Sequence, residues 1–123
     1  MPARSGATPD PLYDAKADLF RVLGHPARVR IVQVLREGER SVGSLQDALG
    51  LDSGGTSQHL AALRGQGLVA TRRQGTSVFY RVADDTLLGL MDAARAVVAS
   101  GIDRQKAQLD ELAGSLDAAE PSA

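Results

Sequence analysis

Few side chains in this chain of 123 residues could do covalent or acid–base chemistry. It has two histidines, His25 and His59, and no cysteine, which excludes disulfides, thiolate metal sites and a cysteine nucleophile. Ser57 lies two positions from His59, so on a helix their side chains point about 200° apart and cannot form a nucleophile–base pair. Because neither histidine has another evident nucleophile beside it, the sequence predicts no enzyme activity.

Ser57 and His59 belong instead to a segment, residues 53–65, with an outer face of small and polar side chains. Its inner positions Thr56, Leu60 and Leu63 are four and three residues apart, which predicts an amphipathic helix. The outer face and its flanks carry Gly54, Ser57, Gln58, His59, Ala61 and Ala62. A helix that enters the DNA major groove, which is about 12 Å wide, needs such a face so that its backbone can approach the base edges.

This helix has the surroundings of a helix-turn-helix, which spans residues 41–68. Apolar residues at helical spacing predict a shorter helix directly before it, and Gly50 suits the left-handed position that ends a helix. Asp52 and Ser53 are good N-caps for the second helix. Gly54 and its neighbour Gly55 lower helix propensity, so we expect this end to fray in the free protein.

A β-hairpin is predicted over residues 68–82, immediately after the helix-turn-helix. β-Branched and aromatic residues form its two flanks, and Gln74 with Gly75 supplies the turn. Polar and basic residues gather at its tip: Arg72, Arg73, Gln74 and Thr76. A basic hairpin in this place is typical of a wing that lies along DNA phosphates. The predicted DNA contacts are therefore Ser53, Gly54, Ser57, Gln58, His59, Arg72, Arg73, Gln74 and Thr76.

The charge distribution agrees with binding of double-stranded DNA by the middle of the chain. The whole chain has a net charge of −1, but residues 26–82 hold eight arginines against four acidic residues, a net charge of +4. Residues 83–123 hold three basic and eight acidic residues, a net charge of −5. A basic middle and an acidic end favour contact with nucleic acid through the middle only.

Two further helices precede the helix-turn-helix, at about residues 12–23 and 26–37, and a last helix begins after Asp84 or Asp85. His25, between the first two, is predicted to be a cap or hinge residue, and the second helix is expected to bury Val29, Ile31, Val32 and Leu35. The apolar stripe of the last helix is broader than a helix needs when it covers only one side of a small domain. A second copy of the chain should therefore cover the rest of the stripe. The predicted dimer interface consists of Leu19, Phe20, Leu23, Leu87, Leu90, Met91, Ala94 and Val98.

The predicted fold is therefore mainly α with a small β-hairpin, a winged helix-turn-helix of order α-α-α-α-β-β-α. Residues 1–11 are expected to be a disordered tail, residues 12–99 the DNA-binding and dimerisation domain, and residues 100–123 a helical extension with an acidic disordered tail. No apolar run approaches the roughly 20 residues of a membrane span. The start of the chain also lacks the apolar region of a signal peptide. We expect a cytoplasmic protein without a membrane partner.

Several runs of this sequence resemble the ArsR/SmtB family of bacterial winged helix-turn-helix regulators. They are LGHPARVRIVQVL (23–35), SVGSLQDALGL (41–51), SQHL (57–60), LRGQGLV (63–69) and QGTSVFYRV (74–82). In order, they match the family's second helix, positioning helix, recognition-helix signature, turn into the wing, and wing. The resemblance covers about residues 12–99. It implies a homodimer paired through its first and last helices, and operator binding as a repressor that an effector releases.

The sequence departs from the family at both common metal sites. Ser41 and Gly43 occupy the positions of two cysteines near the start of the positioning helix. At the last-helix site Asp84 is present, but the other positions hold Thr86, Val97 and Ser100. One strong ligand from each chain would not hold a transition metal, so we expect no metal at these sites and no cofactor.

Two other functions fit the same residues. A winged-helix module that binds a protein is compatible with the slightly acidic whole chain. A DNA-binding activator that works with a partner protein would share all of the predicted DNA chemistry.

Overall fold

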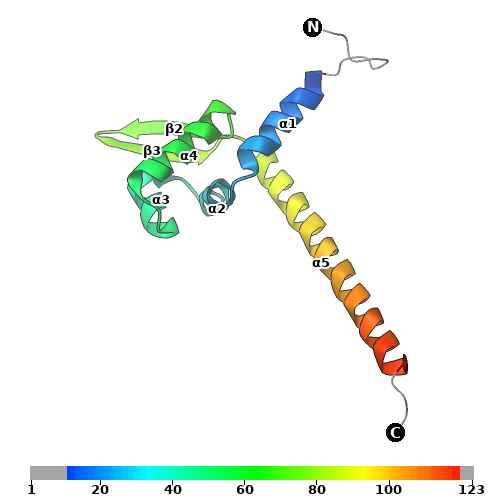
Figure 1. Cartoon of the computed structure of the whole chain (residues 1–123). Coiled ribbons are helices and arrows are strands. Elements are labelled where there is room, and N and C mark those ends of the chain that lie inside the picture. The colour runs from blue at the N-terminus through cyan, green and yellow to red at the C-terminus, as the bar shows by residue number, and fades with distance from the viewer. Residues whose placement is uncertain (1–10, 120–123) are drawn as a thin grey trace. The chain divides into compact units, whose positions relative to one another are not determined.

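The computed structural model describes residues 11–119, which form five helices and three strands (Figure 1). In chain order these are α1 (Pro11–Leu23), α2 (Pro26–Leu35), β1 (Arg40–Ser41), α3 (Val42–Leu49), α4 (Ser53–Gly65), β2 (Val69–Gln74), β3 (Ser77–Val82) and α5 (Thr86–Ala119). The predicted order is confirmed, with β1 as an addition. The predicted tail of residues 1–11 lies outside the described residues except for Pro11, which begins α1.

The chain divides into two compact units at Asp85 and Thr86. Within the described residues, the first unit is 11–85 and the second is α5 alone. The predicted division after residue 99 falls inside α5, which continues through Ser100 and Gly101. One glycine in a helix interior costs only about 1 kcal/mol relative to alanine, so good helix formers on both sides carry the helix across it.

The helix boundaries of the first unit follow from capping residues that the sequence shows. His25 is the N-cap of α2, and its Nδ1 accepts the Ala27 N–H at 3.2 Å. The Ser41 hydroxyl caps α3 by accepting the Ser44 N–H at 3.1 Å. Gly50 ends α3 in the left-handed conformation, with φ 64° and ψ 32°. These local bonds satisfy backbone groups that a helix end leaves without an internal partner.

The core of the first unit joins α2, α3 and α4. Its fully buried side chains are Ile31, Val32, Leu45, Thr56, Leu60 and Leu63. The predicted inner stripe of the recognition helix is thus confirmed. The prediction that Val29 is buried is wrong, since Val29 is 39% exposed. On a helical wheel Ala27, Ile31 and Leu35 lie within one face, and Val29 points well away from it.

The three strands form one antiparallel sheet in the order β1-β3-β2. β2 and β3 pair from Val69 with Val82 to Gln74 with Ser77. The loop between them is therefore Gly75 and Thr76, one residue later than the predicted turn at Gln74 and Gly75. Gly75 has φ 62°, the positive value that the first loop position of a type II′ hairpin turn needs.

The long helix α5 carries large apolar side chains that remain exposed. They are Val97, Val98, Ile102, Leu109, Leu112 and Leu116, each at least 57% exposed. No helix among the described residues is long and apolar enough to cross a bilayer.

Candidate nucleic-acid interface

The N-terminus of α4 is fixed by one residue that precedes the helix. The carboxylate of Asp52 accepts the Gly55 N–H at 2.6 Å, and the Asp52 carbonyl accepts the Thr56 hydroxyl at 2.7 Å. Thr56 is fully buried, so the second bond ties the cap to the core. The first turn of α4 is therefore held by the Asp52 carboxylate, which precedes the helix, and by the buried side chain of Thr56.

The two glycines of this turn differ in their surroundings. A Cβ on Gly55 would lie 2.8 Å from Oδ1 of Asp52, whereas a Cβ on Gly54 would have no heavy atom within 4 Å. A side chain at position 55 would therefore displace the capping carboxylate, whereas Gly54 leaves the outer face open. Fraying at this end stays a prediction, but the structure forms the helix from Ser53 onward.

The outer face of α4 carries the side chains that the sequence predicts to meet DNA. Ser53, Gly54, Ser57 and Gln58 are all exposed, and Ala61 continues the same small surface. The described structure places them on one helix above the buried stripe. Such a face lets a helix backbone come close to base edges in a major groove.

His59 has different surroundings from the other predicted contacts. It is half-buried, and its Nδ1 accepts a hydrogen bond from Nε of Arg28 at 3.3 Å. Its ring lies 4.3 Å from the ring of His25, centroid to centroid. Burial lowers the pKa of His59 from 6.5, and the nearby His25 and Arg28 lower it further. The imidazole therefore stays neutral near neutral pH, and a DNA contact by His59 stays a prediction.

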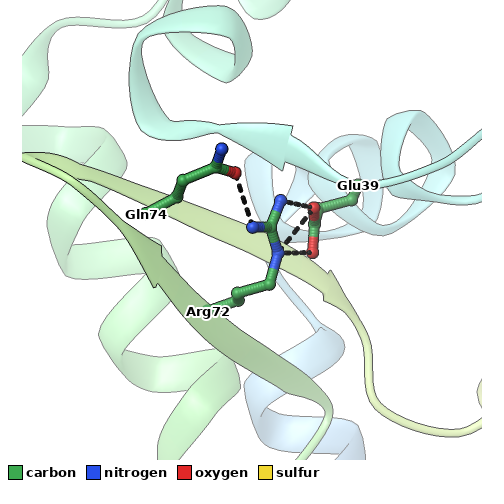
Figure 2. A network of polar contacts seen from close by, with 3 residues as sticks. All are labelled: Glu39, Arg72 and Gln74. Carbon is green, nitrogen blue, oxygen red and sulfur yellow. Dashed lines mark hydrogen bonds and ion pairs between the residues drawn. The ribbon is translucent and has the colours of Figure 1, made fainter.

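The wing is anchored by an ion pair that the sequence did not reveal. Nε of Arg72 donates to both carboxylate oxygens of Glu39, at 3.1 and 3.2 Å, and Nη1 donates to Oε1 of Gln74 at 2.7 Å. Figure 2 shows the guanidinium of Arg72 between these two partners. The same guanidinium lies 4.7 Å from the centroid of the Phe79 ring.

These contacts give Arg72 partners within the protein in addition to the role predicted for it. Its guanidinium binds Glu39 and Gln74 in the free protein, and a phosphate contact by Arg72 stays a prediction. The hydrogen bond from Arg72 lowers the pKa of the Glu39 carboxyl below its ordinary value of 4.5, and the charges of Arg72 and Arg81 act in the same direction. Glu39 is 33 residues from Arg72, a separation at which no local pattern pairs two side chains.

The other predicted wing residues lie at or near the tip of the hairpin, where Gln74 uses its side-chain oxygen to accept from Arg72. Arg73, Gln74 and Thr76 are exposed. Since side chains alternate along a strand, Arg73 lies on the sheet face opposite Arg72 and shares its face with Val69. Val69 is 3% exposed, so Arg73 projects from the sheet face whose base packs into the core.

Side chains predicted to form a dimer interface differ in exposure. Phe20 on α1 is 57% exposed and Val98 on α5 is 62% exposed, which leaves both able to contact another chain. Leu19, Leu90 and Met91 are half-buried and Ala94 is exposed. Leu23 and Leu87 are only 7% and 6% exposed in one chain. These two side chains expose little surface in a single chain, and their part in a dimer interface stays a prediction.

The geometry is that of a winged helix-turn-helix, and residues 25–71 match the sequence profile of "Bacterial regulatory protein, arsR family". The chain is 42% identical over 104 residues to the HTH-type transcriptional regulator Rv0081 of Mycobacterium tuberculosis, covering 84% of this chain and 91% of Rv0081. The chain belongs to the ArsR family of bacterial regulatory proteins. The predicted resemblance is confirmed, and members of this family are transcriptional regulators, not enzymes.

Three further comparisons bear on fold, assembly and regulation. The biofilm growth-associated repressor of Agrobacterium fabrum is 37% identical over 100 residues, covering 78% of this chain and 86% of that repressor. The structure of a homodimeric winged helix-turn-helix DNA-binding domain, Mb0332 of Mycobacterium bovis, aligns with a TM-score of 0.68 at 31% identity, covering 76% and 90% of the two chains. The crystal structure of Rv0081 aligns with a TM-score of 0.73, covering 79% and 98%.

Proposed function

We propose that this ArsR-family protein represses transcription by binding, as a homodimer, to an operator that is an imperfect inverted repeat. The observation that carries the proposal is the outer face of α4, where Ser53, Gly54, Ser57 and Gln58 are exposed over a fully buried stripe. Their small size admits the helix backbone to a major groove, and the Asp52 cap holds the helix end that would enter it.

The polar residues divide into those that contact base edges and those that contact the DNA phosphates or the minor groove. Gln58 can make a bidentate pair with adenine, and Ser57 can accept from or donate to several base edges. Arg73 and Thr76, exposed at the wing tip, reach phosphates or the minor groove. In the free protein Arg72 also binds Glu39, which joins the wing to the segment before β1.

The homodimer proposal rests on exposed apolar side chains of α1 and α5. Phe20 and Val98 are more than half exposed in a single chain, and Leu19, Leu90, Met91 and Ala94 accompany them. The Mb0332 domain, a relative in fold and sequence, is homodimeric. A two-fold dimer presents two recognition helices to half-sites about one DNA turn apart, which is why we expect an inverted repeat.

The experiment is selection of DNA fragments bound by the full chain from the genome that encodes it. We expect one enriched motif with two-fold symmetry, whose affinity falls steeply with salt because bound phosphates release counterions. Transcription in vitro from a promoter that contains the motif should decrease when the protein is added. Absence of any enriched motif, or binding that is insensitive to salt, would refute DNA recognition, and increased transcription would refute repression.

A further inference from the structure

The two histidines of the chain meet at the recognition helix, although 34 positions separate them in the sequence. His25 precedes α2 and His59 lies in α4, with ring centroids 4.3 Å apart and ring planes tilted by 52°. Nδ1 of His25 accepts the Ala27 N–H, and Nδ1 of His59 accepts the Arg28 Nε–H. Each ring therefore uses Nδ1 as an acceptor, which leaves the proton of the neutral imidazole on Nε2.

Arg28 connects this histidine pair to a third element. Its Nη1 donates to the carbonyl of Val22 at 3.1 Å, near the end of α1, while its Nε donates to His59 in α4. Val22 is 4% exposed, so the carbonyl belongs to a packed segment. One guanidinium thus links α1, α2 and the recognition helix through a bond that only a neutral His59 can accept.

Protonation of His59 would convert this arrangement from attractive to repulsive. The added proton would occupy Nδ1, so two donors would face each other where Arg28 now donates to His59. The imidazolium would also lie beside the guanidinium of Arg28 and against the ring of His25. Partial burial of a charge without a compensating partner is costly, so the ring must turn away from Arg28 and the bond that ties α4 to α2 is lost.

We propose that His59 is a positioning residue for the recognition helix, and that its protonation releases the protein from operator DNA in acid. The inference rests on the proposed DNA-binding function and adds a regulatory input to it. The geometry predicts whether protonation raises or lowers the affinity for DNA. A histidine that touched phosphate directly would strengthen binding on protonation, whereas a histidine that orients α4 through Arg28 weakens it.

The groups that surround His59 support this direction. The elements packed against α4 are α1, α2, α3 and β2. Within the described part of the chain, the charges that act on the His59 imidazole are those of His25 and Arg28, and both disfavour its protonated form. Its pKa lies below 6.5, so the neutral ring dominates near pH 7 and protonation takes place as the medium becomes acidic.

The test compares the wild type with His59→Asn, using the DNA duplex obtained by the selection described above. Asparagine Oδ1 lies close to the place of Nδ1, so it can still accept from Arg28, but it does not titrate. The readout is the ratio of affinities at about pH 7.5 and about pH 5 within each protein, so a change in absolute affinity does not affect it. If a dimer binds only when both of its His59 rings are neutral, wild-type affinity should fall up to about tenfold per protomer, or about a hundredfold per dimer, for each pH unit below the pKa of His59.

We expect this loss in the wild type and a flatter profile in His59→Asn. Equal ratios in the two proteins would overturn the proposal, and so would wild-type affinity that rises in acid relative to the variant. A second measurement needs no DNA: nuclear magnetic resonance should show the Arg28 Nε–H signal change with the same midpoint as the His59 ring. Independent midpoints would refute the switch. Failure to bind any DNA near pH 7.5 would refute the proposed function separately.

Discussion

Gly54 and Gly55 are neighbours in the first turn of α4, yet only Gly55 faces the capping carboxylate of Asp52. Replacing either glycine by alanine raises helix propensity by the same amount, about 1 kcal/mol. At Gly54 the new methyl group meets no heavy atom within 4 Å, so this gain should appear in full. At Gly55 the methyl group would lie 2.8 Å from Oδ1 of Asp52.

Gly55→Ala must therefore displace the carboxylate that accepts the Gly55 N–H at 2.6 Å. Loss of an N-cap costs about 0.5–2 kcal/mol, which offsets the gain in propensity. We expect Gly54→Ala to stabilise the protein by about 1 kcal/mol and Gly55→Ala to leave its stability nearly unchanged. For a domain of this size the first change corresponds to a rise of about 4–8 °C in the unfolding midpoint.

The assay is thermal unfolding without DNA, with all variants at one protein concentration because a dimer makes the midpoint concentration-dependent. The matched control is the same pair of substitutions in an Asp52→Ala background. Without the carboxylate, the two alanines should have equal effects, and the difference between the two backgrounds isolates the clash with the cap. The reasoning is refuted if Gly55→Ala stabilises the wild type as much as Gly54→Ala does.

Four further outcomes are expected. Gln58→Ala should relax base preference at one or two positions of the selected motif, at about 1–3 kcal/mol per lost bidentate contact, and an unchanged motif would contradict the orientation assigned to α4. Arg73→Ala should weaken binding to all sequences alike and lower the dependence of affinity on salt, measured by titration at several salt concentrations. Light scattering should show a dimer at micromolar concentration that Phe20→Asp converts to monomers, and a monomeric wild type would end the dimer proposal. Arg72 lowers the pKa of Glu39, so their ion pair stabilises the protein above pH 4.5. This contribution is lost as pH falls through the lowered pKa. Glu39→Gln should remove that part of the pH dependence of thermal unfolding.

The effector also stays open to measurement. The resemblance places Ser41 and Gly43 at the positions of the family's cysteine pair, and Thr86, Val97 and Ser100 beside Asp84 at its last-helix site. We therefore expect neither family site to bind metal. Calorimetry with zinc and nickel checks this expectation. A stoichiometric dissociation constant below about a micromolar, coupled to a change in operator affinity, would contradict it.

Local features of the structure were determined by the sequence alone. The inner stripe of α4 follows from the spacing of Thr56, Leu60 and Leu63, because residues four and three positions apart share one helix face. Gly50 and Asp52 mark the end of α3 and the start of α4 because their conformational and hydrogen-bonding preferences act within a few residues. The exposed polar face opposite the stripe, which is the candidate DNA surface, follows from the same periodicity.

Tertiary structure decided the features that depend on residues far apart in the chain. Glu39 accepts hydrogen bonds from Arg72, which lies 33 residues later in the chain. Arg28 donates a hydrogen bond to His59, which lies 31 residues later. Neither pair leaves a pattern in the sequence, because packing of separate elements alone brings them within hydrogen-bond distance. The same holds for β1, whose two residues become a strand only by pairing with β3. Periodicity can show which face of a helix is inside, but which polar side chains meet there depends on how the helices and the sheet are packed together.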